Sequence, residues 1–121
     1  MHRPSLKPIY WMGDTLKELR RSPEEVKQSV GYALELVQRG SKPGNAKPLK
    51  GFRGASVLEI VADHSAGTWR AIYSVEVADT VYVLHFFQKK STKGIATPQR
   101  HIDLVTRRLR EAKQFGKRGH R

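Results

Sequence analysis

The sequence contains no cysteine, so disulfide bonds and thiolate metal sites are excluded. It also has no apolar run long enough to span a bilayer, and its start, MHRPSLKP, lacks the apolar core of a signal peptide. A chain without cysteine is compatible with a reducing cytoplasm. We therefore expect a cytoplasmic protein that does not interact with a membrane.

Acidic residues are scarce as well. The 11 Asp and Glu stand against 23 Lys and Arg, which gives a net charge of +12. The excess is concentrated in two segments: residues 86–121 hold eleven basic and two acidic residues, and residues 39–54 hold five basic residues and no acid. Such clusters are typical of proteins that bind a polyanion, although a solvated basic surface without a function is the plainer interpretation.

The length of 121 residues and the apolar content of 38% predict one domain, residues 1–121, with flexible tails at 1–6 and 116–121. Residues 7–12 have the composition of a first strand. Asp14 is placed to cap a short helix through Leu19, and Ser22-Pro23-Glu24-Glu25 is a start signal for a second helix that ends at Gly40. The apolar stripe of this second helix consists of Val26, Val30, Ala33, Leu34 and Val37.

The second half of the chain has the pattern of strands followed by a helix. Residues 41–54 carry two prolines and three glycines and predict a loop. Strands are expected at 56–63, 68–77 and 81–89, and their short connections predict an antiparallel meander. Thr97-Pro98 opens a last helix with an apolar stripe at Ile102, Val105, Leu109 and Ala112. The order of N-terminal strand, helix pair, three-stranded antiparallel meander and C-terminal helix predicts an α+β fold.

Period-two alternation assigns the strand residues to faces. On strand 68–77, Trp69, Ala71 and Tyr73 are expected to face the core, and Arg70 the other side. On strand 81–89, we expect one face to hold Tyr82, Leu84 and Phe86, and the opposite face to hold Val83, His85, Phe87 and Lys89. Arg70, His85, Phe87 and Lys89 would then line one cleft.

This set of side chains suits RNA: cations hold phosphate, an aromatic ring stacks on a base, and an imidazole exchanges protons. No metal-ligand spacing such as HxxxH or HExxH occurs, so we expect no metal and no cofactor, and any phosphodiester cleavage would be metal-independent. Each residue also has a plainer interpretation. Arg70 can pair with a neighbouring Glu, His85 can be half-buried, Phe87 can pack, and Lys89-Lys90 can be a solvated strand end.

Several motifs match a known family. The strings Leu58-Glu59-Ile60, Trp69-Arg70-Ala71-Ile72-Tyr73 and Leu84-His85-Phe86-Phe87-Gln88-Lys89-Lys90-Ser91, then Thr97-Pro98, resemble the phage-derived HigB-like branch of the RelE toxins. Members of that branch show an aromatic-Arg-x-x-Tyr strand and an LHxFxKK strand end before a Thr-Pro helix start. Lys47-Pro48-Leu49-Lys50-Gly51 resembles the loop before the family's first meander strand.

The resemblance implies a RelE-like fold, with a helix pair on one face of the sheet and a basic cleft on the other. It implies a toxin of a type II toxin-antitoxin system that cleaves mRNA on translating ribosomes, and a helix-turn-helix, HigA-like antitoxin as partner. It implies catalytic roles for Arg70, Lys89 and Lys90. The residues expected to contact RNA are Lys50, Arg53, His85, Phe87, Gln88 and Lys93.

Two other functions remain open at this stage. The ParE-like branch of the same scaffold is thought to inhibit DNA gyrase rather than cut RNA. A non-catalytic RNA-binding module would have the same cations, would bind RNA with a steep salt dependence and would leave it intact.

Overall fold

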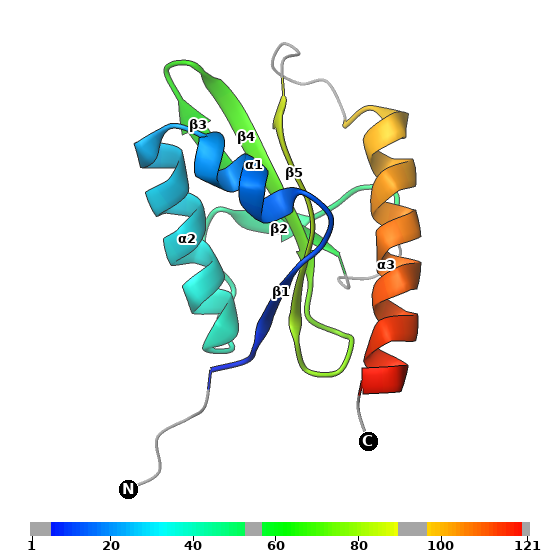
Figure 1. The fold of residues 1–121 in the computed structure, drawn as a ribbon. Helices are drawn as coiled ribbons and strands as arrows, with labels where there is room; N and C mark the ends of the chain where they lie inside the picture. The colour runs from blue at the N-terminus through cyan, green and yellow to red at the C-terminus, as the bar shows by residue number, and fades with distance from the viewer. Residues whose placement is uncertain (1–5, 53–56, 90–96, 120–121) are drawn as a thin grey trace, which may run out of the picture.

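The computed structural model describes residues 6–52, 57–89 and 97–119 (Figure 1). The elements are β1 (Ile9–Trp11), α1 (Thr15–Arg21), α2 (Glu24–Gln38), β2 (Ala46–Pro48), β3 (Leu58–His64), β4 (Gly67–Ser74), β5 (Val81–Lys89) and α3 (Gln99–Gly119). Of the two expected tails, residues 1–5 lie outside the described part of the chain. The other is helical as far as Gly119, so α3 extends into the segment expected to be a tail.

The five strands form one mixed sheet in the order β1-β5-β4-β3-β2. The α+β class is confirmed, and β3, β4 and β5 form the expected antiparallel meander. The finer topology differs from the prediction in two ways. Strand β1 adds to β5 in parallel, and residues 46–48, expected within a loop, pair with residues 58–60 as strand β2. A strand of three residues, Ala-Lys-Pro, is too short to show an alternating pattern, so pairing with β3 rather than local propensity makes it a strand.

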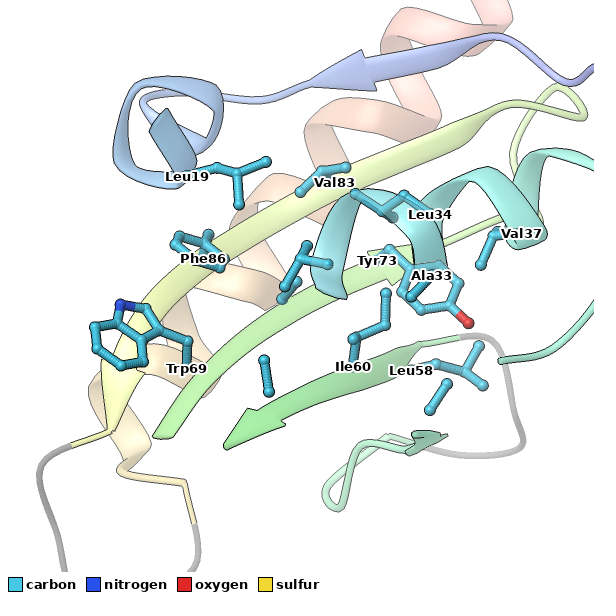
Figure 2. Close-up of a cluster of buried hydrophobic side chains, with 14 of the residues drawn as sticks. Leu19, Ala33, Leu34, Val37, Leu58, Ile60, Trp69, Tyr73, Val83 and Phe86 are labelled. Atoms are coloured by element: carbon cyan, nitrogen blue, oxygen red, sulfur yellow. The ribbon is translucent and has the colours of Figure 1, made fainter. Parts of the chain in front are cut away.

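Helices α1 and α2 cover one face of the sheet. The apolar stripe of α2 is buried as expected, and it packs on Ile60, Ala71, Tyr73 and Val83 from the three central strands (Figure 2). Trp69 closes the end of this cluster beside Phe86 (Figure 2). The apolar side chains spaced by four and three on α2 thus pack against those spaced by two on β4, and together they form one core.

Helix α3 covers part of the opposite face, where the resemblance implied an open cleft (Figure 1). Its stripe packs as predicted: Val105, Leu109 and Ala112 are buried and Ile102 is partly buried against them. This second cluster also holds Ile72 and Leu84 from the sheet. The sheet is therefore packed on both sides.

A β-bulge in β5 makes the expected assignment of faces wrong. Ile72 pairs with His85 but Tyr73 pairs with Val83, so Leu84 is an extra residue in the ladder. As a result Tyr82, Leu84, His85 and Phe87 face α3, whereas Val83 and Phe86 face the helix pair. Period-two alternation fails here because one inserted residue reverses the face of every residue on one side of it.

The helix-start signals act differently from the prediction. Asp14 is the N-cap of α1 but makes no side-chain capping hydrogen bond, and its carboxylate lies 3.7 Å from Nη2 of Arg108 on α3. Ser22 does not cap α2, because its hydroxyl donates to the carbonyl of Leu19, 2.6 Å away, at the end of α1. The N-cap of α2 is Pro23. Asp14 thus contacts α3 and Ser22 closes the end of α1, and neither side chain caps a helix start.

Candidate functional site

A pocket of about 500 Å³ opens between the β2 edge of the sheet and the first turn of α3. Its basic side chains are Lys47, Lys50, Arg70 and Lys89, and one carboxylate, Glu59, lies among them. Thr97, Gln99 and Ile102 form the wall on the side of α3. Most of the charge in this pocket is positive, which favours an anionic ligand, and its volume lies in the range of ordinary small-ligand sites.

Strand register explains why these residues converge. Lys47 lies opposite Glu59, Arg70 lies opposite Phe87, and Lys89 lies opposite Thr68. Residues that pair directly, or that are two apart on one strand, share a face of the sheet. Strands β2 to β5 therefore each contribute to the same face, and the expectation that Arg70 and Lys89 share it is confirmed.

Arg70 forms an ion pair with Glu59 at the floor of the pocket. Its Nη1 donates to both carboxylate oxygens at 2.9 Å, and the two side chains are only 14% and 5% exposed. Lys47 adds a longer contact of 3.8 Å from Nζ to the same carboxylate. The plainer interpretation of Arg70, a strand arginine paired with a neighbouring Glu, thus describes the free protein. The pairing fixes the guanidinium in the pocket, since a buried carboxylate needs a partner.

Lys89 lies in a partly desolvated and cationic environment. Burial lowers the pKa of its ammonium group below the usual value, and the neighbouring Arg70 lowers it further. Lys47 acts in the same direction, whereas the negative charge of Glu59 opposes the shift. A lysine with a lowered pKa releases its proton more readily, which favours a role in proton transfer.

His85 and Phe87 share this face but do not line the pocket, because the first turn of α3 covers them. Nε2 of His85 lies 2.7 Å from Nδ1 of His101, and the imidazole of His85 is 8% exposed. Phe87 stacks on His101 with 3.9 Å between ring centroids. The two rings therefore lie on the same face as Arg70 and Lys89 but outside the lining of the pocket, and not with them in one open cleft as expected from the sequence.

The other expected RNA contacts fall in three places. Lys50 is exposed and lines the pocket with Arg70 and Lys89. Gln88 lies on the other face, where its Nε2 donates to the carbonyl of Ala66, 3.0 Å away, in the turn between β3 and β4. The remaining two, Arg53 and Lys93, lie outside the described part of the chain, as does Lys90, which was expected to be catalytic.

Sequence reasoning did not single out Glu59 as a site residue. It stands in an apolar strand and is 4% exposed, so its burial beside Arg70 is its main distinguishing feature. A signal was present, because a carboxylate between Leu58 and Ile60 is rarely buried unless it is paired. His101 was missed as well, since the face of α3 that docks on β5 depends on the bulge.

Two further kinds of feature can be checked in the described ranges 6–52, 57–89 and 97–119. There, no three His, Asp or Glu side chains gather as a candidate metal site. Within the same ranges, no helix has the length and hydropathy needed to cross a bilayer.

Fold and pocket together define a small α+β protein with a cationic site beside its C-terminal helix. The family model described as phage derived protein Gp49-like (DUF891) matches residues 17–110, and the chain belongs to this family. The Gp49-like proteins are a toxin-type family of the RelE/HigB kind, which implies an antitoxin partner. None of the curated proteins matches the chain. The matched residues include β2 to β5 and the first half of α3, and hence the whole described lining of the pocket.

Proposed function

We propose that this protein is the toxin of a type II toxin-antitoxin system, of the HigB-like branch, and that it is an mRNA endoribonuclease acting on translating ribosomes. The observation that carries the proposal is the convergence of Arg70 and Lys89 with the carboxylate of Glu59 in one open pocket. A cation that binds phosphate, a lysine with a lowered pKa and a carboxylate are the groups that metal-independent phosphodiester cleavage needs.

The reaction would proceed by attack of the ribose 2′-oxygen on the adjacent phosphorus. The P–O5′ bond breaks, and the products carry a 2′,3′-cyclic phosphate and a free 5′-hydroxyl. Arg70 would stabilise the charge that gathers on the phosphorane oxygens. Glu59 would accept the proton of the 2′-hydroxyl, and Lys89 would donate a proton to the leaving 5′-oxygen. Lys90, expected to assist in catalysis, lies outside the described residues.

RNA would reach the pocket from the side of Lys47 and Lys50, which are exposed at the rim. Their charges hold the phosphates of the flanking nucleotides and add affinity that depends on salt concentration. The same two lysines are suited to contact ribosomal RNA, in agreement with a ribosome-bound substrate. A helix-turn-helix, HigA-like antitoxin would neutralise the protein until the antitoxin is lost.

The test is expression of the protein in bacteria, with primer extension on mRNA recovered from ribosomes. We expect growth arrest and new 5′ ends within translated regions. The double variant Arg70→Ala/Lys89→Ala should abolish both effects, and Arg107→Ala/Arg110→Ala, which removes the same charge from the exposed side of α3, should preserve them. Arrest with intact mRNA and induced DNA damage would instead identify a gyrase inhibitor. RNA binding without new ends would identify a binding module.

A further inference from the structure

The first turn of α3 forms one wall of the pocket, so the shape of the pocket depends on how this turn is held. Thr97, Gln99 and Ile102 line the pocket directly. His101, between Gln99 and Ile102 in the same turn, does not line the pocket. Its side chain contacts β5 instead. The contacts that hold His101 against β5 therefore also hold the first turn of α3 in place as the wall of the pocket.

His101 is held by a hydrogen bond and by an aromatic stack. Its Nδ1 lies 2.7 Å from Nε2 of His85, and its ring lies parallel to that of Phe87, with 13° between the planes. Among the described residues, Nδ1 of His85 is buried without a partner. A buried N–H without an acceptor is the costlier arrangement, so the proton sits on Nε2 of His85, which donates to His101.

We propose that His101 is a positioning residue, which through His85 and Phe87 locks the first turn of α3 as the wall of the phosphate pocket. The inference rests on the proposed function in one respect: the pocket is taken to receive an RNA phosphate. It assigns to His85 a role in support of the site rather than the contact with RNA expected from the sequence.

A second attachment limits the effect of His101 to the start of the helix. Two turns further along α3, Nη1 of Arg108 donates to the carbonyl of Leu84, the extra residue of the bulge, at 2.9 Å. Its Nη2 lies 3.7 Å from the carboxylate of Asp14. Below Arg108, Leu109 and Ala112 are buried in the core. If the contacts of His101 with His85 and Phe87 are lost, the rest of α3 stays packed on the sheet, and only the first turn, which forms the pocket wall, becomes more mobile.

Burial, assisted by neighbouring positive charges, keeps both imidazoles neutral. Burial lowers the pKa of His85 to about 4, and His101 and Arg108 on α3 lower it in the same sense, against the opposing charge of Asp14. Burial also lowers the pKa of His101, with a further contribution from Arg100. The hydrogen bond between neutral rings therefore persists at physiological pH, and protonation of the acceptor, Nδ1 of His101, by acid breaks it.

Two substitutions of His101 separate the hydrogen bond from the stack. His101→Phe keeps a ring against Phe87 but leaves Nε2 of His85 without an acceptor. His101→Asn keeps an acceptor for His85 but removes the ring. Gln114→Ala, on the exposed side of the same helix, is the matched control. Two properties are measured on the full chain: hydrogen exchange of α3, and the affinity for inorganic phosphate followed by the NMR signals of Arg70 and Lys89.

We expect His101→Phe to bind phosphate about tenfold more weakly, because one buried hydrogen bond is lost. Exchange should rise in peptides covering 97–105 but not in peptides covering 106–116. His101→Asn should stay within about threefold of the parent protein, since the hydrogen bond survives in a slightly altered geometry. Gln114→Ala should match the parent in both measurements.

Three results would overturn the proposal. His101→Phe could leave exchange and affinity unchanged, His101→Asn could be as impaired as His101→Phe, or exchange could rise evenly along α3, as expected from a general loss of stability. Hydrogen exchange does not depend on RNA cleavage. If the parent protein cuts no mRNA but the exchange pattern appears, the proposed function fails and the positioning role stands. If mRNA is cut but the pattern is absent, the reverse holds.

Discussion

Arg70 and Glu59 form an ion pair that is buried on one side by the sheet and open on the other to the pocket, with 2.9 Å from Nη1 to each carboxylate oxygen. The pair has two consequences. It orients the guanidinium before substrate arrives, and it places a negative charge where a phosphate would otherwise be attracted. The net effect on stability can be measured.

Removing one partner of this pair should cost more than removing both. We expect Arg70→Gln alone to lower the free energy of unfolding by about 3 kcal/mol, because Glu59 then stays buried without a counter-ion. The double variant with Glu59→Gln should be less destabilised than the sum of the two single variants by at least about 1 kcal/mol. Urea unfolding of the four proteins measures this coupling, and additive effects would show that the pair is not coupled.

The pKa of Lys89 should move in opposite directions in two variants. Replacing Arg70 with Ala removes a neighbouring positive charge and should raise the pKa of Lys89. Glu59→Gln removes the negative charge that opposes the shift and should lower it. NMR titration of the lysine side chains after ¹³C-dimethylation reports both values. No change in either variant would mean that burial alone sets the pKa, and a change in the same direction in both would contradict the opposing effects of the two charges.

His85 should make the protein less stable in acid. Its folded pKa of about 4 lies below the ordinary value of 6.5, so the unfolded chain takes up a proton as the pH falls through 6.5 and the folded protein does not. Stability from this group is complete above about pH 6.5 and is lost progressively towards pH 4. Between pH 7.5 and 4.5 the loss from His85 should reach about 2 kcal/mol.

The variant His85→Gln isolates this effect, because the amide keeps a donor for His101 but does not titrate. Urea unfolding at both pH values should show a shallower decline in the variant than in the parent. The Asp and Glu side chains titrate in both proteins and cancel in the comparison. Equal declines would mean that the imidazole is not kept neutral by the fold.

Two helical glycines should respond in opposite ways to alanine. A Cβ at Gly116 of α3 would lie 2.6 Å from Cγ1 of Val77, so Gly116→Ala should destabilise the protein by about 1–3 kcal/mol. A Cβ at Gly31 of α2 would meet nothing within 4 Å, so Gly31→Ala should stabilise it by about 0.5–1 kcal/mol. Thermal unfolding of the two variants gives both signs, and stabilisation by Gly116→Ala would mean that α3 does not approach the sheet so closely.

The sequence patterns predicted the elements and part of the site because regular periodicity survives in them. The stripe on α2, the stripe on α3 and the common face of Arg70 and Lys89 all follow from spacings that hold over several residues. These patterns predict which residues share a side. They do not predict which other element lies against that side.

The errors come from single residues and from contacts distant in sequence. Leu84 is apolar like its neighbours, so nothing marks it as the residue that bulges out of the ladder and places His85 under α3. Strand β2 exists only through its pairing with β3. The burial of Glu59 depends on Arg70 eleven positions away, and the pairing was considered only as a plain interpretation of Arg70.

Strand β1 pairs with β5, and α3, which follows β5 in the chain, supplies one wall of the pocket. A chain that ends before residue 97 would therefore keep the basic side chains of the pocket but lack the wall formed by Thr97, Gln99 and Ile102. Such distant pairings also form slowly. The proposed activity therefore requires α3 to be docked on the sheet, and not only the strands that carry the basic side chains.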